Sequence, residues 1–136
     1  MPDLRDGLRE QVGSMTGGAG VDIVIDPVGG AANAAALRAM AWCGRMVIIG
    51  FASGDIPSIK ANYLLVKNIE VSGLQWSDYR ERDPEAVAWV QKELFGYWIA
   101  GKLNPIISHR FELSDYAKAL SLLKQGRAQG KIVLLP

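Results

Sequence analysis

The sequence contains little that could make a metal site, a disulfide framework or a membrane span. Its 136 residues include one cysteine, Cys43, and one histidine, His109, which excludes an internal disulfide framework and a Cys/His zinc cluster. No uncharged apolar run approaches the roughly 18 residues of a membrane-spanning helix, and the first residues do not have the pattern of a signal peptide. We therefore expect a cytoplasmic protein that binds neither zinc nor a membrane.

The chain also lacks an excess of charge of either sign. Fifteen Lys and Arg residues nearly balance 14 Asp and Glu residues, for a formal net charge of +1 at pH 7. A general electrostatic attraction to nucleic acid is therefore not expected. Apolar residues make up 49% of the chain and charged residues 21%, which is typical of a globular domain and excludes intrinsic disorder.

The motifs that mark dedicated phosphate loops and nucleophilic enzymes are missing. The sequence has no G-x-G-x-x-G and no G-x-x-x-x-G-K-[ST], so no segment is typical of a pyrophosphate-binding turn. It also has no G-x-S-x-G elbow and no supporting Ser/His/Asp or Cys/His arrangement. A function has to come from another feature of the chain.

Helices and apolar strands alternate along the sequence. Hydrophobic spacing predicts helices over 3–16, 31–42, from Pro84 to about Gly101, and from Ser114 onward. Apolar runs predict strands over 21–25, 46–49, 69–74, within 105–113, and in the final KIVLLP. This alternation is typical of a parallel sheet, because parallel neighbours need a crossover connection. We expect an α/β fold comprising half of a doubly wound sheet, since only one βαβαβ half is visible.

Three of the predicted strands end in segments rich in glycine and small residues. These are DPVGG, GFASG and GLQ. Sheets of this type bind ligands at the carboxyl ends of their strands, so the pattern favours a nucleotide-like ligand there. Asp26 has no phosphate turn about 20 residues before it, and we interpret it as a residue that stabilises its own turn. Cys43 is interpreted as a small buried side chain.

Four segments stand in an order and spacing that resemble a known family. They are MTGGAGVDIVIDPVGG, LRAMAWCGRMVIIGFASGDIP, NIEVSGLQW and GKIVLLP. Together they resemble the C-terminal half of medium-chain dehydrogenase/reductases, and most of all the zinc-free NADPH:quinone oxidoreductase branch. The resemblance implies a Rossmann-like half-sheet in residues 1–104, the second half of a dinucleotide-binding domain. It implies that residues 105–136 are a C-terminal helix–strand return belonging to a catalytic domain.

The same resemblance implies a set of cofactor-binding positions. Val28 would run beside the adenosine and ribose, while Lys131 would lie near the cofactor phosphates. The strand-end segments would line the nicotinamide side, largely through backbone amides, at Ile49, Gly50, Phe51, Ser53, Gly73, Leu74 and Gln75. Ser53 could equally be an ordinary turn serine, and Lys131 a solvated surface residue. No catalytic acid or base is needed, because the hydride chemistry belongs to the cofactor.

The implied function is that of an oxidoreductase using NADP, with NAD also possible, and no zinc. It would move a hydride to a small-molecule substrate, a quinone or a related conjugated carbonyl. Family members carry an N-terminal catalytic domain and a Gly-rich turn, so we expect this chain to be a fragment or truncated product without activity of its own. The alternative function is an inactive dimerisation or folding module. A methyltransferase is disfavoured by the terminal GKIVLLP segment.

One expected partner is a second copy of the chain. The predicted strand 69–74 is the last strand of the half-sheet, and an unpaired strand edge can pair with another chain. Trp76 and Tyr79 follow it and are of the types enriched in interface cores. In the resembling family this strand pairs with its mate across a two-fold axis. We therefore expect a homodimer built through residues 69–79.

Overall fold

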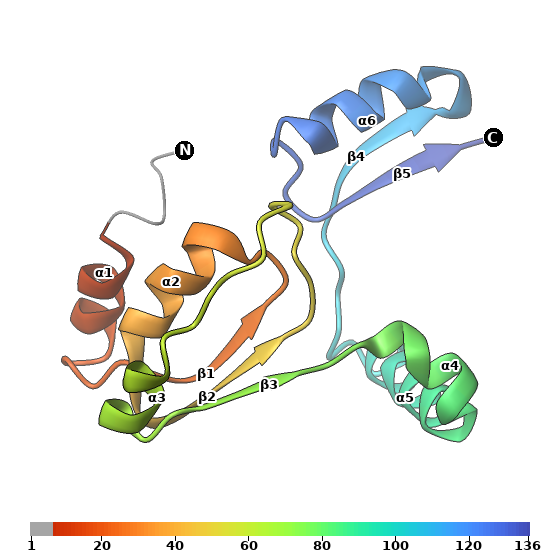
Figure 1. Cartoon of the computed structure of the whole chain (residues 1–136). Coiled ribbons are helices and arrows are strands. Elements are labelled where there is room, and N and C mark those ends of the chain that lie inside the picture. The colour runs from red at the N-terminus through yellow and green to blue at the C-terminus, as the bar shows by residue number, and fades with distance from the viewer. Residues whose placement is uncertain (1–6) are drawn as a thin grey trace. The chain divides into compact units, whose positions relative to one another are not determined.

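The chain forms two compact units, which divide after Asp83. The computed structural model describes residues 7–136 (Figure 1). The first unit, Met1–Asp83, contains a three-stranded sheet, and the second, Pro84–Pro136, contains a two-stranded sheet. None of the helices in the described part of the chain has the length and apolar character needed to cross a bilayer.

The first unit alternates helices with parallel strands. Its elements are α1 (Leu8–Met15), β1 (Val21–Asp26), α2 (Gly30–Ala39), β2 (Met40–Ile48), α3 (Ala61–Lys67), β3 (Glu70–Gly73), the 3₁₀ turn η1 (Trp76–Asp78) and α4 (Tyr79–Arg82). The predicted helix 3–16 is seen as α1, and its residues 3–6 lie outside the described part of the chain. The alternation predicted from apolar periodicity is confirmed.

The three strands lie side by side in the order β1-β2-β3, and both pairings are parallel. Val24, Met46 and Val71 stand opposite one another across the sheet. β2 is therefore the central strand, and β1 and β3 are the two edges. The segments containing α2 and α3 make the crossovers that parallel neighbours require. The predicted α/β class with a parallel sheet is confirmed.

One face of this sheet carries the core of the unit. The buried cluster consists of Leu37, Met40, Met46 and Ile69, with Val24, Leu64 and Val71 packed against it. Met46 has no exposed surface, because helices α2 and α3 cover its side of the sheet. Burying side chains of this size contributes roughly 1.5–3 kcal/mol each.

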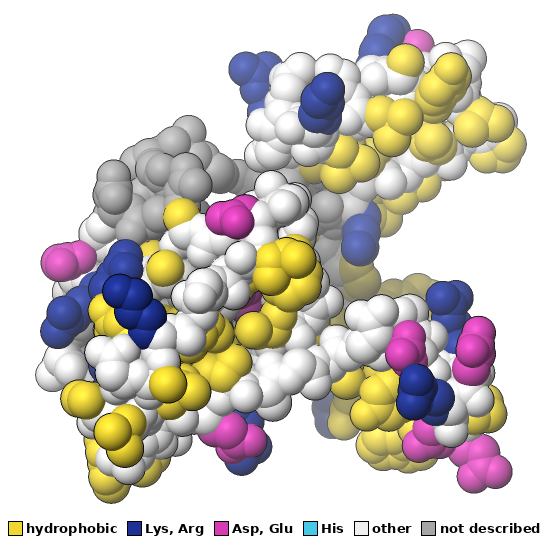
Figure 2. All heavy atoms as spheres, viewed as in Figure 1, with side chains coloured by type: hydrophobic (Ala, Val, Ile, Leu, Met, Phe, Trp, Pro, Cys, Tyr) yellow, Lys and Arg dark blue, Asp and Glu magenta, His cyan; other side chains and the backbone are white. Residues whose placement is uncertain are grey.

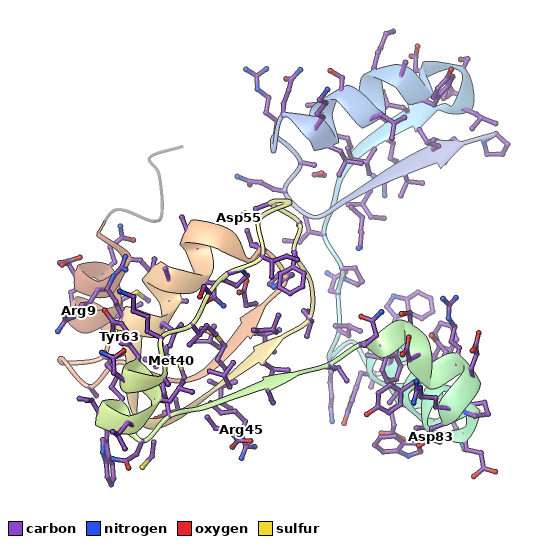
Figure 3. All side chains as sticks on the ribbon, in the orientation of Figure 1. Arg9, Met40, Arg45, Asp55, Tyr63 and Asp83 are labelled. Carbon is purple, nitrogen blue, oxygen red and sulfur yellow. The ribbon has the colours of Figure 1, made fainter. Side chains whose placement is uncertain are left out.

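The other face of the sheet is open within the first unit. Ile23 and Ile25 of β1 are 68% and 64% exposed. Next to them, Arg45 and Glu70 form an ion pair with an Nε–Oε2 distance of 3.0 Å. Arg45, labelled in Figure 3, lies in the carboxyl-terminal half of β2. A doubly wound sheet has helices on both faces, so this unit supplies one helical layer of such a sheet.

The junction of α2 and β2 differs from the sequence-based expectation. The helix predicted over 31–42 ends at Ala39, and the strand begins directly at Met40. Pairing of Val21 with Met40 starts the ladder to β1, and the register then shifts before Ile23. This tertiary pairing overrides the helix propensity of the sequence. Within the shift, Cys43 adopts φ 61° and is exposed, so the expectation of a buried Cys43 was wrong.

Lys67 of α3 holds the end of α2. Its Nζ donates to the carbonyl oxygens of Leu37, Arg38 and Met40 at 3.3, 2.9 and 2.8 Å. A cation at this point satisfies carbonyls that have no partner inside the helix, and it is favoured by the helix dipole. Burial, followed by the nearby charge of Arg9, lowers the pKa of Lys67 below its ordinary value.

The second unit combines a long helix with a small parallel sheet. Its elements are α5 (Pro84–Ile99), β4 (Ile107–Glu112), the 3₁₀ turn η2 (Leu113–Asp115), α6 (Tyr116–Lys124) and β5 (Lys131–Leu135). β4 and β5 pair in parallel with α6 as the crossover, so the predicted helix–strand return is observed. No residue of α5 is buried. The predicted functional boundary after residue 104 stays a prediction.

Candidate functional site

The carboxyl ends of the three strands meet at one edge of the first unit. The amide of Ile49 donates to the carbonyl oxygen of Asp26 at 2.9 Å, which joins the ends of β1 and β2. The amide of Leu74 donates to the carbonyl oxygen of Ile48, also at 2.9 Å, which joins β2 to β3. The three segments predicted to bind a ligand therefore lie side by side.

Asp26 organises the turn after β1. Its Oδ1 accepts hydrogen bonds from the amides of Val28 at 2.8 Å and Gly29 at 3.0 Å. Its Oδ2 accepts from Asn33 Nδ2 of α2 at 2.7 Å. Both residues are buried: Asp26 is 5% exposed to solvent and Asn33 is 1% exposed. The interpretation of Asp26 as a turn-stabilising residue is confirmed.

The hydrogen bonds around Asp26 also decide its protonation. Burial alone raises the pKa of this carboxyl group, because it disfavours the charged form. The bonds from Gly29, Asn33 and Val28 favour the charged form, and together they hold the pKa of Asp26 below its ordinary value. The turn is thus built around a carboxylate.

Close packing explains the two glycines of this turn. Gly29 has φ 74°, and a Cβ there would lie 2.7 Å from the carbonyl oxygen of Asp55 and 3.0 Å from Phe51 Cδ1. Gly30 has φ 52° and donates its amide to the carbonyl oxygen of Asp55 at 3.0 Å. Asp55 lies in the middle of the loop that joins β2 to α3 (Figure 3). A side chain at either glycine would push the loop away from the turn.

The loop after β2 is fastened to the turn after β1. Ala52 donates its amide to the carbonyl oxygen of Pro27 at 3.0 Å, and Ser53 donates its amide to that of Val28 at 3.0 Å. The Ser53 hydroxyl also donates to Val28 O, at 2.7 Å. Because a hydroxyl carries one proton, Ser53 uses its donor within the chain here and keeps acceptor capacity. This geometry favours the ordinary turn role of Ser53.

A cleft of about 340 Å³ opens at this edge of the sheet. It is lined by Ile48, Ile49, Gly50, Phe51, Gly73, Leu74 and Gln75. Six of the nine predicted site residues therefore line one cavity. Within residues 7–136, the amides of Gly50, Phe51 and Gln75 donate no hydrogen bond. Three free N–H groups beside an apolar wall can bind the oxygen atoms of a ligand.

Gly73 differs from the glycines of the turn because the packing of the chain does not require a glycine at this position. A Cβ at Gly73 would have no atom within 4 Å and so would point into open space, while one at Gly50 would make an ordinary 3.4 Å contact with Pro27 O. The absence of a side chain at Gly73 keeps the cleft wide without helping the chain to pack.

A second cleft of about 420 Å³ shares its wall with the first. It is lined by Gly73, Leu74, Gln75, Asp78, Tyr79, Arg82 and Asp83. The rings of Trp76 and Tyr79 are stacked with their centroids 5.2 Å apart, and Arg82 Nε lies 3.7 Å from Asp78 Oδ2. The sequence analysis placed residues 76–79 in an interface and did not connect this segment with a cavity.

The remaining predicted residues have separate positions. Val28 is bonded through Ser53 to the loop after β2 but does not line the 340 Å³ cleft. Lys131 is the first residue of β5 in the second unit, where its amide donates to the carbonyl oxygen of Ile106 at 2.7 Å. The roles of Val28 and Lys131 in cofactor binding stay predictions.

Asn33 is the structural residue that the sequence analysis missed. It bridges Asp26 Oδ2 to the sulfur of Met46 in the core, with Nδ2 3.2 Å from that sulfur. The available signal was its setting, since Asn33 is the only polar residue in the run AANAAA. A polar residue with low helix propensity in an alanine-rich helix indicates a specific hydrogen bond.

Comparison with known proteins agrees with this geometry. A family model described as zinc-binding dehydrogenase matches residues 5–134. The chain belongs to the zinc-binding dehydrogenase family. The predicted membership in the medium-chain dehydrogenase/reductases, as a C-terminal half, is thereby confirmed.

Among curated members of the family, quinone oxidoreductase-like protein 2 of Bos taurus is 38% identical over 130 residues. That match covers 96% of this chain and 37% of the relative. Among solved structures, a mycobacterial protein complexed with NADPH has a TM-score of 0.81 at 26% identity, with 99% of this chain and 41% of that one covered. Escherichia coli quinone oxidoreductase complexed with NADPH gives 0.78 at 26% identity, covering 95% and 40%. This chain thus spans about 37% of the curated relative's length.

The family description raises the question of zinc. Within the described residues 7–136, no group of three or more His, Cys, Asp or Glu side chains could hold a metal ion. The donor set of a zinc site needs three or four such ligands. The residues described here therefore do not fit a zinc site, and no step of the proposed chemistry runs through a metal.

The Asp26 network predicts a pH-dependent loss of stability in Asp26→Asn. At neutral pH we expect the free energy of unfolding to fall by about 1–3 kcal/mol, because Asn33 Nδ2 loses its acceptor. A depressed folded-state pKa contributes stability that is present above the unfolded pKa of about 3.9 and is lost as pH falls through the folded value. The difference between the variant and the unmodified chain should therefore shrink from about pH 4 downward. Urea unfolding over a pH series measures it.

Asp22→Asn is the matched control for this experiment, since Asp22 is an exposed carboxylate on the same strand. It should change the unfolding free energy by less than about 0.5 kcal/mol. Equal losses in the two variants, or a loss in Asp26→Asn that does not vary with pH, would contradict the role assigned to Asp26.

Proposed function

We propose that this chain is the cofactor-binding part of an NAD(P)H-dependent oxidoreductase that reduces a quinone or a related conjugated carbonyl. The observation that carries the proposal is the 340 Å³ cleft at the strand ends, with free amides at Gly50, Phe51 and Gln75. The family assignment and the NADPH complexes of two structural neighbours support the choice of cofactor. NADP is the preferred cofactor in this proposal, and NAD is its alternative.

The residues of the cleft suit the nicotinamide end of such a cofactor. A carboxamide offers a carbonyl acceptor to backbone N–H groups, and the three free amides are donors of that kind. Ile48, Ile49 and Phe51 give an apolar wall for a ring, and Gly73 leaves the space beside it open. When bound, the reduced nicotinamide supplies the hydride that the substrate accepts. The part of the chain described here binds and orients the ring.

The quinone substrate is proposed from the relatives rather than from a pocket in this chain. Quinone oxidoreductase-like protein 2 of Bos taurus is the curated relative described above, and the present chain spans 37% of its length. The activity of a whole protein is therefore proposed, and the chain alone is expected to be inactive. The competing function, an inactive dimerisation or folding module, predicts a chain that assembles without binding cofactor.

The proposed homodimer uses the free edge of the sheet. β3 is an edge strand, and its amides alternate in direction. The amide of Leu74 donates to Ile48 O of β2. Because Val71 is an odd number of residues away from Leu74, its amide points in the opposite direction, toward the open edge. The exposed Trp76–Tyr79 stack continues from this strand. Two copies related by a two-fold axis could pair through residues 69–79 and extend the sheet.

For the cofactor site we predict that Gly73→Ala weakens NADPH binding about tenfold, or about 1.4 kcal/mol, without lowering the stability of the chain. The added methyl group meets no atom of the chain, so it leaves the packing of the fold unchanged and narrows the cleft for a bound molecule. Affinity is expected to be weaker than micromolar, because the sequence has no G-x-G-x-x-G turn of the kind that holds a dinucleotide's pyrophosphate. The affinity is measured by titrating each protein with NADPH and monitoring the amide NMR shifts of residues 48–51 and 73–75.

The control for this variant is Gly13→Ala in α1, where a Cβ also has no atom within 4 Å. It should leave NADPH binding unchanged. Shifts that are absent from the cleft, or that are equally weakened by both variants, would overturn the proposed site and favour the module without cofactor. Turnover of a quinone with NADPH by the chain alone would contradict its expected inactivity.

We predict that the substitution Val71→Pro converts the proposed dimer to a monomer. Proline has no backbone N–H group, so the substitution removes the hydrogen-bond donor that β3 presents at its open edge. Val71→Thr is nearly isosteric, keeps that donor, and should leave the dimer intact. Light scattering at micromolar concentration gives the masses, and circular dichroism checks that both variants fold. A well-folded monomer in the unmodified chain would refute the proposed dimer.

A further inference from the structure

A third cleft lies on the helical side of the first unit and is separate from the cleft at the ends of β2 and β3. It has a volume of about 260 Å³ and is lined by Asn33, Ala34, Leu37, Arg38, Ser58, Ile59, Lys60 and Tyr63. These residues come from α2, from the segment before α3, and from α3 itself. The proposed cofactor cleft shares none of them. This α2–α3 cleft has no part in the function proposed above.

The charges at the α2–α3 cleft have one sign. Arg38 and Lys60 are its only ionisable lining residues besides Tyr63, and no acidic residue lines it. Within the described part of the chain, neither the Arg38 guanidinium nor the Lys60 ammonium has an ion-pair or hydrogen-bond partner. Lys and Arg side chains gather on this side of the unit in Figure 2.

The lining also includes three apolar side chains, Ala34 and Leu37 of α2 and Ile59 of the segment before α3. Leu37 is part of the buried core, and Ile59 packs against that core. An apolar cavity of about 150 Å³ is enough to hold benzene. The 260 Å³ found here can therefore hold one ring and a small anionic group at the rim.

Asn33 adds a polar group to this lining. Its Nδ2 is used by Asp26 and Met46, while its Oδ1 is buried and has no hydrogen-bond partner in the described chain. Buried polar atoms in native proteins nearly always have a partner. A bound molecule that carries a hydroxyl or amino group on its apolar end would supply the missing donor.

We propose that the α2–α3 cleft binds a small aromatic oxyanion, with its phosphate or carboxylate group between Arg38 and Lys60 and its ring on Leu37 and Ile59. Arginine suits such a group because its guanidinium can donate two parallel hydrogen bonds to two oxygens of one anion. A hydroxyl group on the far side of the ring donates to Asn33. The ligand is held by the helical layer of the unit, so its binding does not depend on the cofactor.

The test uses the 136-residue chain and 4-hydroxyphenyl phosphate as the probe. We expect amide NMR shifts confined to residues 33–38 and 58–63, and an affinity that falls about tenfold in Arg38→Gln and again in Lys60→Gln. Inorganic phosphate, which lacks the ring, should bind at least tenfold more weakly than the probe. Phenyl phosphate lacks the donor and should bind about threefold more weakly.

Lys124→Gln is the control variant, because Lys124 is an exposed cation on α6 in the other unit. It should leave the affinity unchanged. Equal weakening by all three charge variants would show nonspecific attraction and overturn the site, as would equal binding of inorganic phosphate. Equal binding of phenyl phosphate would overturn the role of Asn33. A titration with NADPH present should give the same affinity, and a loss of affinity there would also contradict an independent site.

Discussion

The carboxylate of Asp26 is the interaction on which the first unit depends. It accepts hydrogen bonds from the turn after β1 and from Asn33 of α2, so it joins a strand, a turn and a helix at one point. Through Asn33 the same network reaches Met46 in the core. A buried charge is stable only where hydrogen bonds replace its water, and this requirement fixes the path of the chain around it.

The candidate site follows from that arrangement. With the first turn fixed, Gly29 and Gly30 leave room for the loop after β2 to pack at Asp55, and Ser53 is bonded to Val28. The loop therefore leaves its first amides, at Gly50 and Phe51, without partners among residues 7–136. The cleft has free donors because the groups around it have already satisfied one another.

The two sides of the sheet are used differently. The helical side buries the core and presents the α2–α3 cleft, with Arg38 and Lys60 at its rim. The opposite side leaves Ile23 and Ile25 exposed in this unit. In the second unit the whole of α5 lacks a buried residue. Exposed apolar area of this kind is common on surfaces that bind another protein or a ligand.

The sequence by itself determined the order of the elements and where the strand ends lie. Periodicity and turn residues are local properties, so the parallel sheet could be predicted from them. The family resemblance implied Ile49, Gly50, Phe51, Gly73, Leu74 and Gln75, and the structure places these six residues along one cleft. It did not determine that Met40 begins a strand or that Cys43 is exposed. The helix propensity of 40–42 is outweighed by pairing with β1, a contact with residues about 20 positions away.

Only the tertiary structure decided which polar groups are satisfied and which are free. Ser53 was predicted to be either a hydrogen-bond donor to the cofactor or a turn serine. In this fold its hydroxyl donates a hydrogen bond to the carbonyl oxygen of Val28. Asn33 gains its role because folding places it against Asp26 and Met46. In the part of the chain that the structure describes, the amides of Gly50 and Phe51 donate no hydrogen bond. Hydrogen bonding depends on distances of about 3 Å between groups that are far apart in sequence, and those distances exist only after the chain has folded.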